Sequence, residues 1–314
     1  MPTRLIIDTD TAGDDCFSLL LGLRHPAAKL EAVTICNGNV AFDQQVENAL
    51  HTIEVAGRGG EVPVYLGSAR PLMGRWEAAS FHGSNGMSEM VFPPARQRPE
   101  AKHAIDAIID LVMANPGEIS ISAQAPPTNI ALAYLKEPRI AGALKHLWIM
   151  GGTDNAVGNV TPAAEFNFYV DPEAAKIVFG AGFAITLSTW TLTLASGSID
   201  AEAVGRIEAL GTPLSRFFMD VTETPRKIAF ARYGETISTH PDSLTCAMAI
   251  DESLILESAD VVVDVEVGGE TTRGWSSVHP ARLVERWDDR DPNARIVRRA
   301  DTAGFTDMLI SVLK

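Results

Sequence analysis

Short apolar runs alternate with longer amphipathic segments along the first two thirds of the chain. The apolar runs are rich in Ile, Val and Leu and predict buried strands, whereas the segments between them predict helices. In chain order they are RLIID (4–8), CFSLLLGLR (16–24), EAVTIC (31–36), DQQVENALHTIEVAG (43–57), EISISA (118–123), TNIALAYL (128–135), HLWIM (146–150), DPEAAKIVFGAG (171–182) and FAITLS (183–188). Continuous apolar strands that alternate with helices form a parallel sheet covered on both faces. The pattern therefore predicts an α/β fold with a doubly wound, mostly parallel central sheet.

The last third of the chain has a different pattern. From about Pro213 onward the spacing of apolar residues becomes mainly helical. A late run, ADVVVDVEVGGETTRGW (259–275), alternates apolar and polar residues and contains a Gly-Gly pair, which predicts an antiparallel strand ending in a turn. No linker or repeat separates these parts, so we expect residues 1–314 to form a single domain.

Composition and charge exclude several classes of protein. The 314 residues are 46% hydrophobic and carry a formal net charge of -14, which disfavours nucleic-acid binding, because that depends on clustered Lys and Arg. No run approaches the ~18 to 20 apolar residues of a membrane span, and the start does not resemble a signal peptide. We expect a soluble, cytoplasmic protein without a membrane partner. The cysteines, Cys16, Cys36 and Cys246, are odd in number and scattered, which predicts core thiols.

Polar segments follow the predicted strands, and they are the first place to look for a site. In doubly wound sheets, ligands bind in the crevice at the carboxyl ends of the strands. We therefore expect these segments to face one mouth. They are DTDTAGDD (8–15), NGN (37–39), QAPPTN (124–129), GGTDNAVGN (151–159) and TWT (189–191).

The first of these segments gathers four acidic residues: Asp8, Asp10, Asp14 and Asp15. Ionised carboxylates that close together repel one another in a partly desolvated site, and a hard divalent cation would relieve the repulsion. A solvated turn with a helix-capping Asp is the simpler interpretation, but capping needs one carboxylate. An EF-hand loop is excluded, since its twelfth position would be Leu19 where a bidentate Glu is required.

A phosphotransferase of the haloacid dehalogenase type is a second interpretation of the acidic segment. Its signature is a strand ending in D-x-D-x-T/V, so Asp8 would be the nucleophile and Asp10 its partner. The last signature position is Ala12 here. An acidic mouth without a Gly-rich phosphate loop would also repel a phosphorylated substrate.

A third interpretation rests on a family resemblance. The segment DTDTAGDD resembles the D-T-D-P-G-x-D-D signature of the nucleoside hydrolases, the inosine-uridine-preferring family. Other segments match in the same order: NGNV (37–40), FHGSNGM (81–87), PPTNIALA (126–133), MGG (150–152), NVTPAAEFNFYVDPEAA (159–175), HPDSLTCAMAID (240–251) and TTRG (271–274). The resemblance spans nearly the whole chain, and AEFNFYVDPEAA is its most specific part. It implies an N-ribohydrolase that splits a small nucleoside into ribose and free base.

The resemblance also implies a tightly held Ca²⁺ at the bottom of the pocket. Its ligands would be Asp10, Asp15, Asp242 and the carbonyl oxygen of Gln124, and oxygen donors from separate segments suit Ca²⁺. In the implied mechanism, Asp10 takes a proton from a Ca²⁺-bound water, and the hydroxide attacks the anomeric carbon. The glycosidic bond breaks through an oxocarbenium-like transition state, which nearby negative charge stabilises.

The same resemblance assigns the substrate contacts. Carboxylate and amide groups suit a sugar, because together they accept from and donate to adjacent hydroxyls. The implied ribose-binding residues are Asp14, Asn39, Asn159, Glu165 and Asn167, with Asn37 as a substitute for Asn39. The implied residues of the nucleobase end are His82, Met150 and Trp190. Structural roles are the alternatives: a turn for Asn159, helix entry for Glu165, and core positions for Met150 and Trp190.

Two positions depart from the family pattern. Thr11 and Ala12 replace the Pro-Gly of the opening signature, and Gly13 follows, so the flexible residue is shifted by one. Farther on, Pro241 precedes Asp242 where family members often carry a His that protonates the leaving base.

The proton donor to the base is therefore open. His240 lies one residue earlier and is the candidate general acid. The alternatives are stacking on Trp190, a residue of RKIAFARYGE (226–235), or a substrate with a better leaving group. A relative that binds a nucleoside or sugar without efficient turnover is a further alternative. Family members are commonly dimers or tetramers, which implies a homodimer or homotetramer, and base preference is left open.

Overall fold

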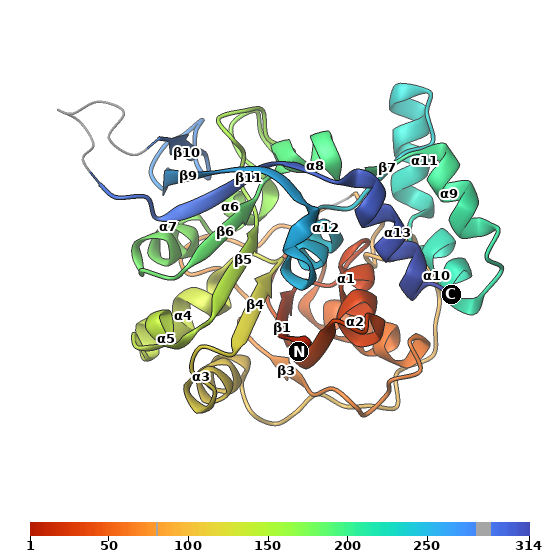
Figure 1. Cartoon of the computed structure of the whole chain (residues 1–314), viewed down its shortest axis with the longest axis horizontal. Helices are drawn as coiled ribbons and strands as arrows, with labels where there is room; N and C mark the ends of the chain where they lie inside the picture. Colours follow the sequence, from red (N-terminus) through yellow and green to blue (C-terminus); the bar gives the residue numbers. More distant parts are fainter. Residues whose placement is uncertain (80, 281–289) are drawn as a thin grey trace.

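A single twisted sheet runs through the molecule. The computed structural model describes residues 1–79, 81–280 and 290–314. Within these ranges, nine strands form one sheet in the order β10-β9-β11-β6-β5-β4-β1-β2-β3 (Figure 1). The strands are β1 (Thr3–Thr9), β2 (Ala28–Ile35), β3 (Val64–Leu66), β4 (Ile119–Ala123), β5 (His146–Met150), β6 (Ile185–Ser188), β9 (Ile255–Val265), β10 (Ser276–His279) and β11 (Ala294–Ala300). The strands from β3 to β11 pair in parallel, whereas β9 is antiparallel to β11 and to β10.

Helices cover both faces of the sheet, as the sequence pattern predicts (Figure 1). One face carries α1 (Asp15–Arg24), α2 (Phe42–Val55), α12 (Pro241–Ile250) and α13 (Thr302–Val312). The opposite face carries α3 (Ala104–Ala114), α4 (Thr128–Lys136), α5 (Ile140–Ala143) and α7 (Pro172–Gly180). Successive residues of β1 alternate between the two cores: Leu5 and Ile7 lie in the first and Ile6 in the second.

Five further helices, a 3-10 turn and a small second sheet make up the remaining elements of the described residues. They are α6 (Phe166–Val170), α8 (Trp190–Ser196), α9 (Ala201–Glu208), α10 (Pro213–Val221), α11 (Glu223–Tyr233), the 3-10 turn Glu252–Leu254, and a small sheet of β7 (Ser198–Ile199) and β8 (Ser238–Thr239). None of the helices among the described residues has both the length and the apolar character that a bilayer crossing requires.

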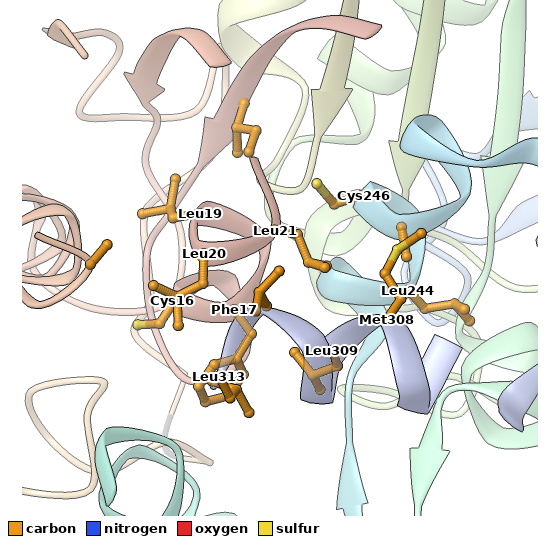
Figure 2. Packing of buried hydrophobic residues seen from close by; sticks show 14 of the residues in the cluster. Cys16, Phe17, Leu19, Leu20, Leu21, Leu244, Cys246, Met308, Leu309 and Leu313 are labelled. Carbon is orange, nitrogen blue, oxygen red and sulfur yellow. The ribbon is translucent and has the colours of Figure 1, made fainter. Parts of the chain in front are cut away.

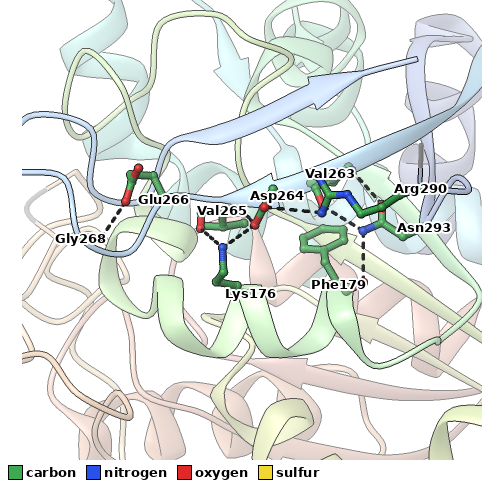
Figure 3. Close-up of polar contacts among 9 residues, drawn as sticks. All are labelled: Lys176, Phe179, Val263, Asp264, Val265, Glu266, Gly268, Arg290 and Asn293. Carbon is green, nitrogen blue, oxygen red and sulfur yellow. Dashed lines mark hydrogen bonds and ion pairs between the residues drawn. The ribbon is translucent and has the colours of Figure 1, made fainter. Parts of the chain in front are cut away.

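The predicted late antiparallel strand is confirmed as β9. Its partner β10 lies beyond the Gly-Gly pair at 268–269, but β9 is also paired with β11, which sequence reasoning did not single out. The side chain of Asn293 fixes this pairing: it donates to the carbonyl oxygens of Phe179 and Val263 and accepts from the Val263 N–H (Figure 3). Lys176 of α7 also pairs with Asp264 at 2.7 Å. The late strand is therefore part of the main sheet.

Helices α1, α12 and α13 pack into one apolar cluster (Figure 2). Phe17 of α1, Leu244 of α12 and Leu309 of α13 are completely buried within it. Cys16 and Cys246 also lie in this cluster, and all three cysteines are free and buried, as the sequence predicts. Because α1 is buried on nearly all sides, its N-terminus is held in a fixed position relative to the N-terminus of α12.

Candidate active site

A cavity of about 970 Å³ opens at the carboxyl ends of the parallel strands. Strand β1 lies between β2 and β4. The chain after β1 continues to β2 and β3 on one side, and then crosses to β4 on the other side of β1. Such a switch point leaves a crevice between diverging loops. All five polar segments expected there contribute to the cavity wall, as do α11 and α12. Their lining residues include Asp14, Asn39, Gln124, Asn159, Trp190, Tyr233 and Asp242.

Four buried carboxylates lie close together here: Asp14 and Asp242 line the cavity, whereas Asp10 and Asp15 lie next to them but outside its wall. Asp10 follows β1, Asp14 and Asp15 begin α1, and Asp242 lies in the first turn of α12. None of them is more than 6% exposed. Asp14 Oδ2 accepts hydrogen bonds from the backbone N–H groups of Asp242, at 2.8 Å, and of Ser243, at 3.3 Å. A carboxylate from α1 thus caps α12 and joins two helices that are far apart in the sequence.

The electrostatics of this cluster favour a cation. Burial raises the pKa of Asp10 well above its usual value, and the Asp15 charge raises it further. Burial, followed by the charges of Asp14, Asp15 and Asp10, does the same to the pKa of Asp242. Burial and the Asp14 charge raise the pKa of Asp15 to about 8, and burial raises that of Asp14 to about 6. A bound divalent cation would reverse these shifts, because it favours the ionised form of each carboxyl.

Free oxygen atoms at the same place meet the requirement for metal ligands. Asp10 Oδ1, Asp242 Oδ1 and Gln124 Oε1 are buried and have no hydrogen-bond partner among the described residues. For Gln124 this free atom is the side-chain oxygen, whereas the main-chain carbonyl oxygen implied by the resemblance accepts from Asn167 Nδ2 at 2.9 Å. Asp15, the third acid of the implied ligand set, is held through both carboxylate oxygens by Thr9 and by the backbone of the turn. As the side chains lie, no three His, Cys, Asp or Glu residues of the described ranges form a metal cage by themselves. Oxygens of other kinds, such as those of Gln124, water or a sugar, would therefore complete the coordination.

The proposed sugar side of the cavity is organised around α6. Glu165 caps this helix by accepting from the Asn167 N–H at 2.8 Å, and it also accepts from the Gly152 N–H at 2.8 Å. Burial raises the Glu165 pKa to about 7. Asn167 donates through Nδ2 to the carbonyl oxygens of Gln124, at 2.9 Å, and Met150, at 3.1 Å. Glu165, Asn167 and Met150 all line the cavity, so the helix-entry role of Glu165 is compatible with a ligand role.

The asparagines of the neighbouring loops have different positions. Asn39 lines the cavity, and its backbone N–H donates to Asp10 Oδ2 at 2.7 Å. Asn37 is not at the cavity; it is buried and donates to Thr128 Oγ1 at 3.1 Å, so it is not a substitute for Asn39. Asn159 is exposed at the cavity, and its Oδ1 accepts from the first N–H of α6.

The outer part of the cavity, where a base would lie, combines aromatic and cationic side chains. Trp190 begins α8, and Arg232 and Tyr233 end α11; all three line the cavity. His82 lines it as well, with its ring directly over Gly13, where an added Cβ would lie 2.0 Å from His82 Nδ1. Burial lowers the pKa of His82 to about 4, so this imidazole is neutral at pH 7.

His240, the expected general acid, is not at the cavity. Its neighbours Thr239 and Pro241 line the wall, but its own ring is fully buried on the other side. There it packs against Phe17 and Phe218, with ring centroids 5.5 Å away in each case. Burial lowers its pKa to about 3. The structure corrects the expectation: this imidazole is not part of the cavity wall, and burial among aromatic side chains holds it neutral at pH 7.

Asp8, the nucleophile of the phosphatase alternative, also lies outside the cavity wall. It is completely buried, and its Oδ1 accepts hydrogen bonds from Thr34 and from Asn129, the latter at 2.8 Å. These contacts tie β1 to β2 and α4. Asp8 is therefore held as a support for the end of the strand that presents Asp10, which does not fit the nucleophile role of the phosphatase interpretation.

Two buried polar residues of α2 hold the acidic turn, and sequence reasoning missed them. Gln45 donates to the carbonyl oxygen of Asp10 at 3.0 Å, and Asn48 donates to the carbonyl oxygens of Thr11 and Asn85, each at 2.9 Å. Both side chains are fully buried and lie among apolar residues on the buried face of α2. Polar residues three positions apart on a predicted buried face are the signal that could have revealed them.

Ser88 is a third residue that sequence reasoning missed, and unlike Gln45 and Asn48 it has no sequence signal. Its φ of 53° is unusual for a residue other than glycine. Its hydroxyl donates to the Val221 carbonyl oxygen at 2.7 Å and accepts from the Thr224 N–H at 2.9 Å. It therefore ties the loop that carries His82 to the start of α11, the two segments that line the base end.

Similarity to known proteins agrees with this geometry. The family described as inosine-uridine preferring nucleoside hydrolase matches residues 5–307. Pyrimidine-specific ribonucleoside hydrolase RihB of Escherichia coli is 32% identical over 268 residues, 84% of this chain and 83% of RihB. The solved structure of the plant nucleoside hydrolase PpNRh1 matches with a TM-score of 0.93 at 29% identity, over 100% of this chain and 99% of that chain. A purine-preferring ribonucleoside hydrolase from Gardnerella vaginalis gives a TM-score of 0.90 at 27% identity, over 99% and 98% of the chains.

The family match covers almost the whole chain, and the matched structures share its complete fold. The resemblance seen in the sequence motifs is therefore confirmed. The chain belongs to the inosine-uridine preferring nucleoside hydrolase family and is an N-ribohydrolase, an enzyme that hydrolyses the N-glycosidic bond of ribonucleosides.

Proposed function

We propose that this chain is a Ca²⁺-dependent ribonucleoside hydrolase in which Asp10 is the general base. Three unpartnered, buried side-chain oxygens carry this proposal: those of Gln124 and Asp242, which line the cavity, and that of Asp10, which lies next to Asp242. Together with Asp15, they form an all-oxygen donor set from three separate segments. Such a set suits Ca²⁺, which takes six to eight oxygen ligands and tolerates irregular geometry, better than the softer metals that prefer nitrogen or sulfur.

The two oxygens of Asp10 have separate tasks in the proposed reaction. Oδ2 is fixed by the Asn39 N–H at 2.7 Å, whereas Oδ1 is unpartnered and would both face the cation and accept the proton of the attacking water. A bound divalent cation supplies acidity, because it lowers the pKa of a coordinated water. The carboxylates around the anomeric carbon then stabilise the positive charge that develops on the sugar as the base departs.

Ribose would be held by the polar residues around the floor. Asp14 and Glu165 present carboxylates and Asn167 presents an amide, and each is anchored by hydrogen bonds to backbone groups. Anchored groups lose little freedom when the sugar binds, which favours a defined orientation of the reacting bond. Asn39 and Asn159 would complete the polyol contacts from the rim.

Activation of the leaving base would come from α11. With His240 buried elsewhere, the cavity-lining groups able to donate a proton or stabilise a departing anion include Tyr233 and Arg232. Trp190 would supply stacking. This assignment agrees with one of the sequence-based alternatives, a residue within 226–235.

The test is a panel of purine and pyrimidine ribonucleosides assayed for ribose release before and after removal of metal. Ca²⁺-dependent release from at least one substrate supports the proposal, and binding without release on every substrate supports a relative that only binds. Both base classes belong in the panel, because RihB is pyrimidine-specific and the Gardnerella enzyme purine-preferring. A cytoplasmic location and assembly into a homodimer or homotetramer stay predictions, to be checked by fractionation and by light scattering.

A further inference from the structure

The turn that replaces the family's Pro-Gly contains an additional hydroxyl group, that of Thr11. Its Oγ1 lies 3.0 Å from Thr9 Oγ1, and Thr9 Oγ1 lies 2.6 Å from Asp15 Oδ1. All three residues are completely buried. The other oxygen of Asp15 accepts from the Ala12 N–H at 3.1 Å. The turn therefore holds both oxygens of one acid.

The direction of these hydrogen bonds follows from the number of protons available. A threonine hydroxyl has one proton to donate, and a carboxylate can only accept. When Asp15 is ionised, as a bound cation would keep it, Thr9 uses its single proton on Asp15, so Thr11 must be the donor in the contact with Thr9. Hydrogen bonds in such a buried chain strengthen one another, since each polarises the next.

We propose that Thr11 is a positioning residue for the cation site, acting through Thr9 on Asp15. This inference rests on the proposed function, in which Asp15 is a ligand of the divalent cation. By donating to Thr9, the Thr11 hydroxyl keeps the Thr9 proton directed at Asp15 and limits the rotation of that carboxylate. A proline at position 11 has no hydroxyl and cannot provide this contact, so this chain has a support for Asp15 that the Pro-containing signature lacks.

The experiment measures Ca²⁺ affinity by calorimetry on metal-stripped protein, without any need for turnover. Thr11→Val removes the hydroxyl and keeps the side-chain shape, and Thr11→Ser keeps the hydroxyl. Mutation of a group that hydrogen-bonds directly to a metal ligand typically changes metal affinity by about 10- to 100-fold. Thr11 is one hydrogen bond farther from the ligand Asp15, so we expect Thr11→Val to weaken Ca²⁺ binding by roughly 3- to 10-fold. Thr11→Ser should bind like the wild type.

A double-mutant cycle distinguishes a positioning role from a general loss of stability. If Thr11 acts through Thr9, Thr11→Val should add no further loss of Ca²⁺ affinity in a Thr9→Val background. Thr186→Val is the matched control, since it removes a buried threonine hydroxyl from β6, where Thr186 contacts His146. It should lower the melting temperature without changing Ca²⁺ affinity.

The outcomes separate this inference from the proposed function. A wild-type protein that binds no divalent cation would overturn the metal proposal itself. Two other results would overturn only the role of Thr11, provided that the wild-type protein binds Ca²⁺. In the first, Thr11→Val binds Ca²⁺ as tightly as the wild type. In the second, Thr11→Val causes the same loss of Ca²⁺ affinity in the wild-type and the Thr9→Val backgrounds. Should Thr11→Val fail to fold, Thr11→Ala removes the same hydroxyl without adding any atom and is read in the same way.

Discussion

Gly38 is expected to be essential for activity because it lies very close to the Asp10 carboxylate. A Cβ added at Gly38 would lie 1.8 Å from Asp10 Oδ2 and 2.5 Å from its Cγ. The Asn39 N–H holds this same carboxylate oxygen at 2.7 Å, so the carboxylate cannot turn away without losing that bond. The φ of Gly38 is not in the left-handed region, so alanine there adds a contact without backbone strain. Gly38→Ala therefore tests the placement of Asp10.

The size of the effect follows from this overlap. Carbon and oxygen that are not bonded stay at least 3.0 Å apart, so Asp10 or the loop must move by about 1 Å. A displacement of that size in a catalytic group lowers the rate by about 100-fold, which corresponds to roughly 2.7 kcal/mol in activation free energy. We expect a similar direction for Ca²⁺ affinity, because the same carboxylate is a proposed ligand.

The assay compares ribose release, Ca²⁺ affinity and melting temperature for Gly38→Ala and a control. Gly205→Ala is the control, since a Cβ there meets nothing within 4 Å and the residue lies in α9, away from the cavity. It should leave kcat and Ca²⁺ affinity unchanged. A folded Gly38→Ala protein with wild-type kcat and wild-type Ca²⁺ affinity would refute the placement of Asp10 described above.

Four further outcomes are expected. Asp10→Asn should lower kcat by about 10²- to 10⁴-fold, the range for loss of a general base, while inhibition by ribose persists; loss of ribose binding in parallel would contradict the assignment. Burial and neighbouring charge raise the pKa values of Asp14 and Asp15 to about 6 and about 8, so the folded metal-free protein retains protons that the unfolded chain has lost. The free energy of unfolding in urea should therefore fall as the pH rises from 5 to 8. The slope should be about 1.4 kcal/mol per pH unit for each proton that only the folded state retains. Saturating Ca²⁺ should abolish that slope, and a flat metal-free profile would argue against the buried cluster. His240→Phe should retain kcat and the pH–rate profile, whereas a general acid in that position would make kcat fall by about 10²- to 10⁴-fold. Tyr233→Phe should lower kcat with little change in Ca²⁺ affinity, and an unchanged kcat would place base activation elsewhere in the cavity.

Much of the fold and of the cavity floor could be predicted because simple periodic rules govern them. Apolar runs with intervening helices define the sheet, and the carboxyl-end rule then brings the segments at 8–15, 124–129 and 151–159 to one place. The strand period also predicts the position of Asp8. It shares a face with Ile6 inside β1, which turns its side chain toward α4 and away from the cavity.

Side-chain direction outside regular elements could not be predicted in this way. His240 lies just before α12, where the extended backbone turns it into the aromatic core while Thr239 and Pro241 remain at the wall. Neighbouring positions in a loop differ in direction according to local torsion angles, which a motif comparison does not reveal. The polar anchors Gln45 and Asn48 were missed for a related reason, since their partners are backbone carbonyl oxygens that have no sequence signal.

The two departures from the family signature have unequal consequences. Thr11 and Ala12 keep Asp15 held through both oxygens, so the cation and sugar end retains its support. The shift of glycine to position 13 gives the ring of His82 room directly above this turn. At the base end, Pro241 stands where the family pattern often has a histidine, and the described residues that line the cavity there include Trp190 and residues of α11 and of the His82 loop, which Ser88 joins. Substitutions in α11 should therefore change which base is released without changing Ca²⁺ affinity.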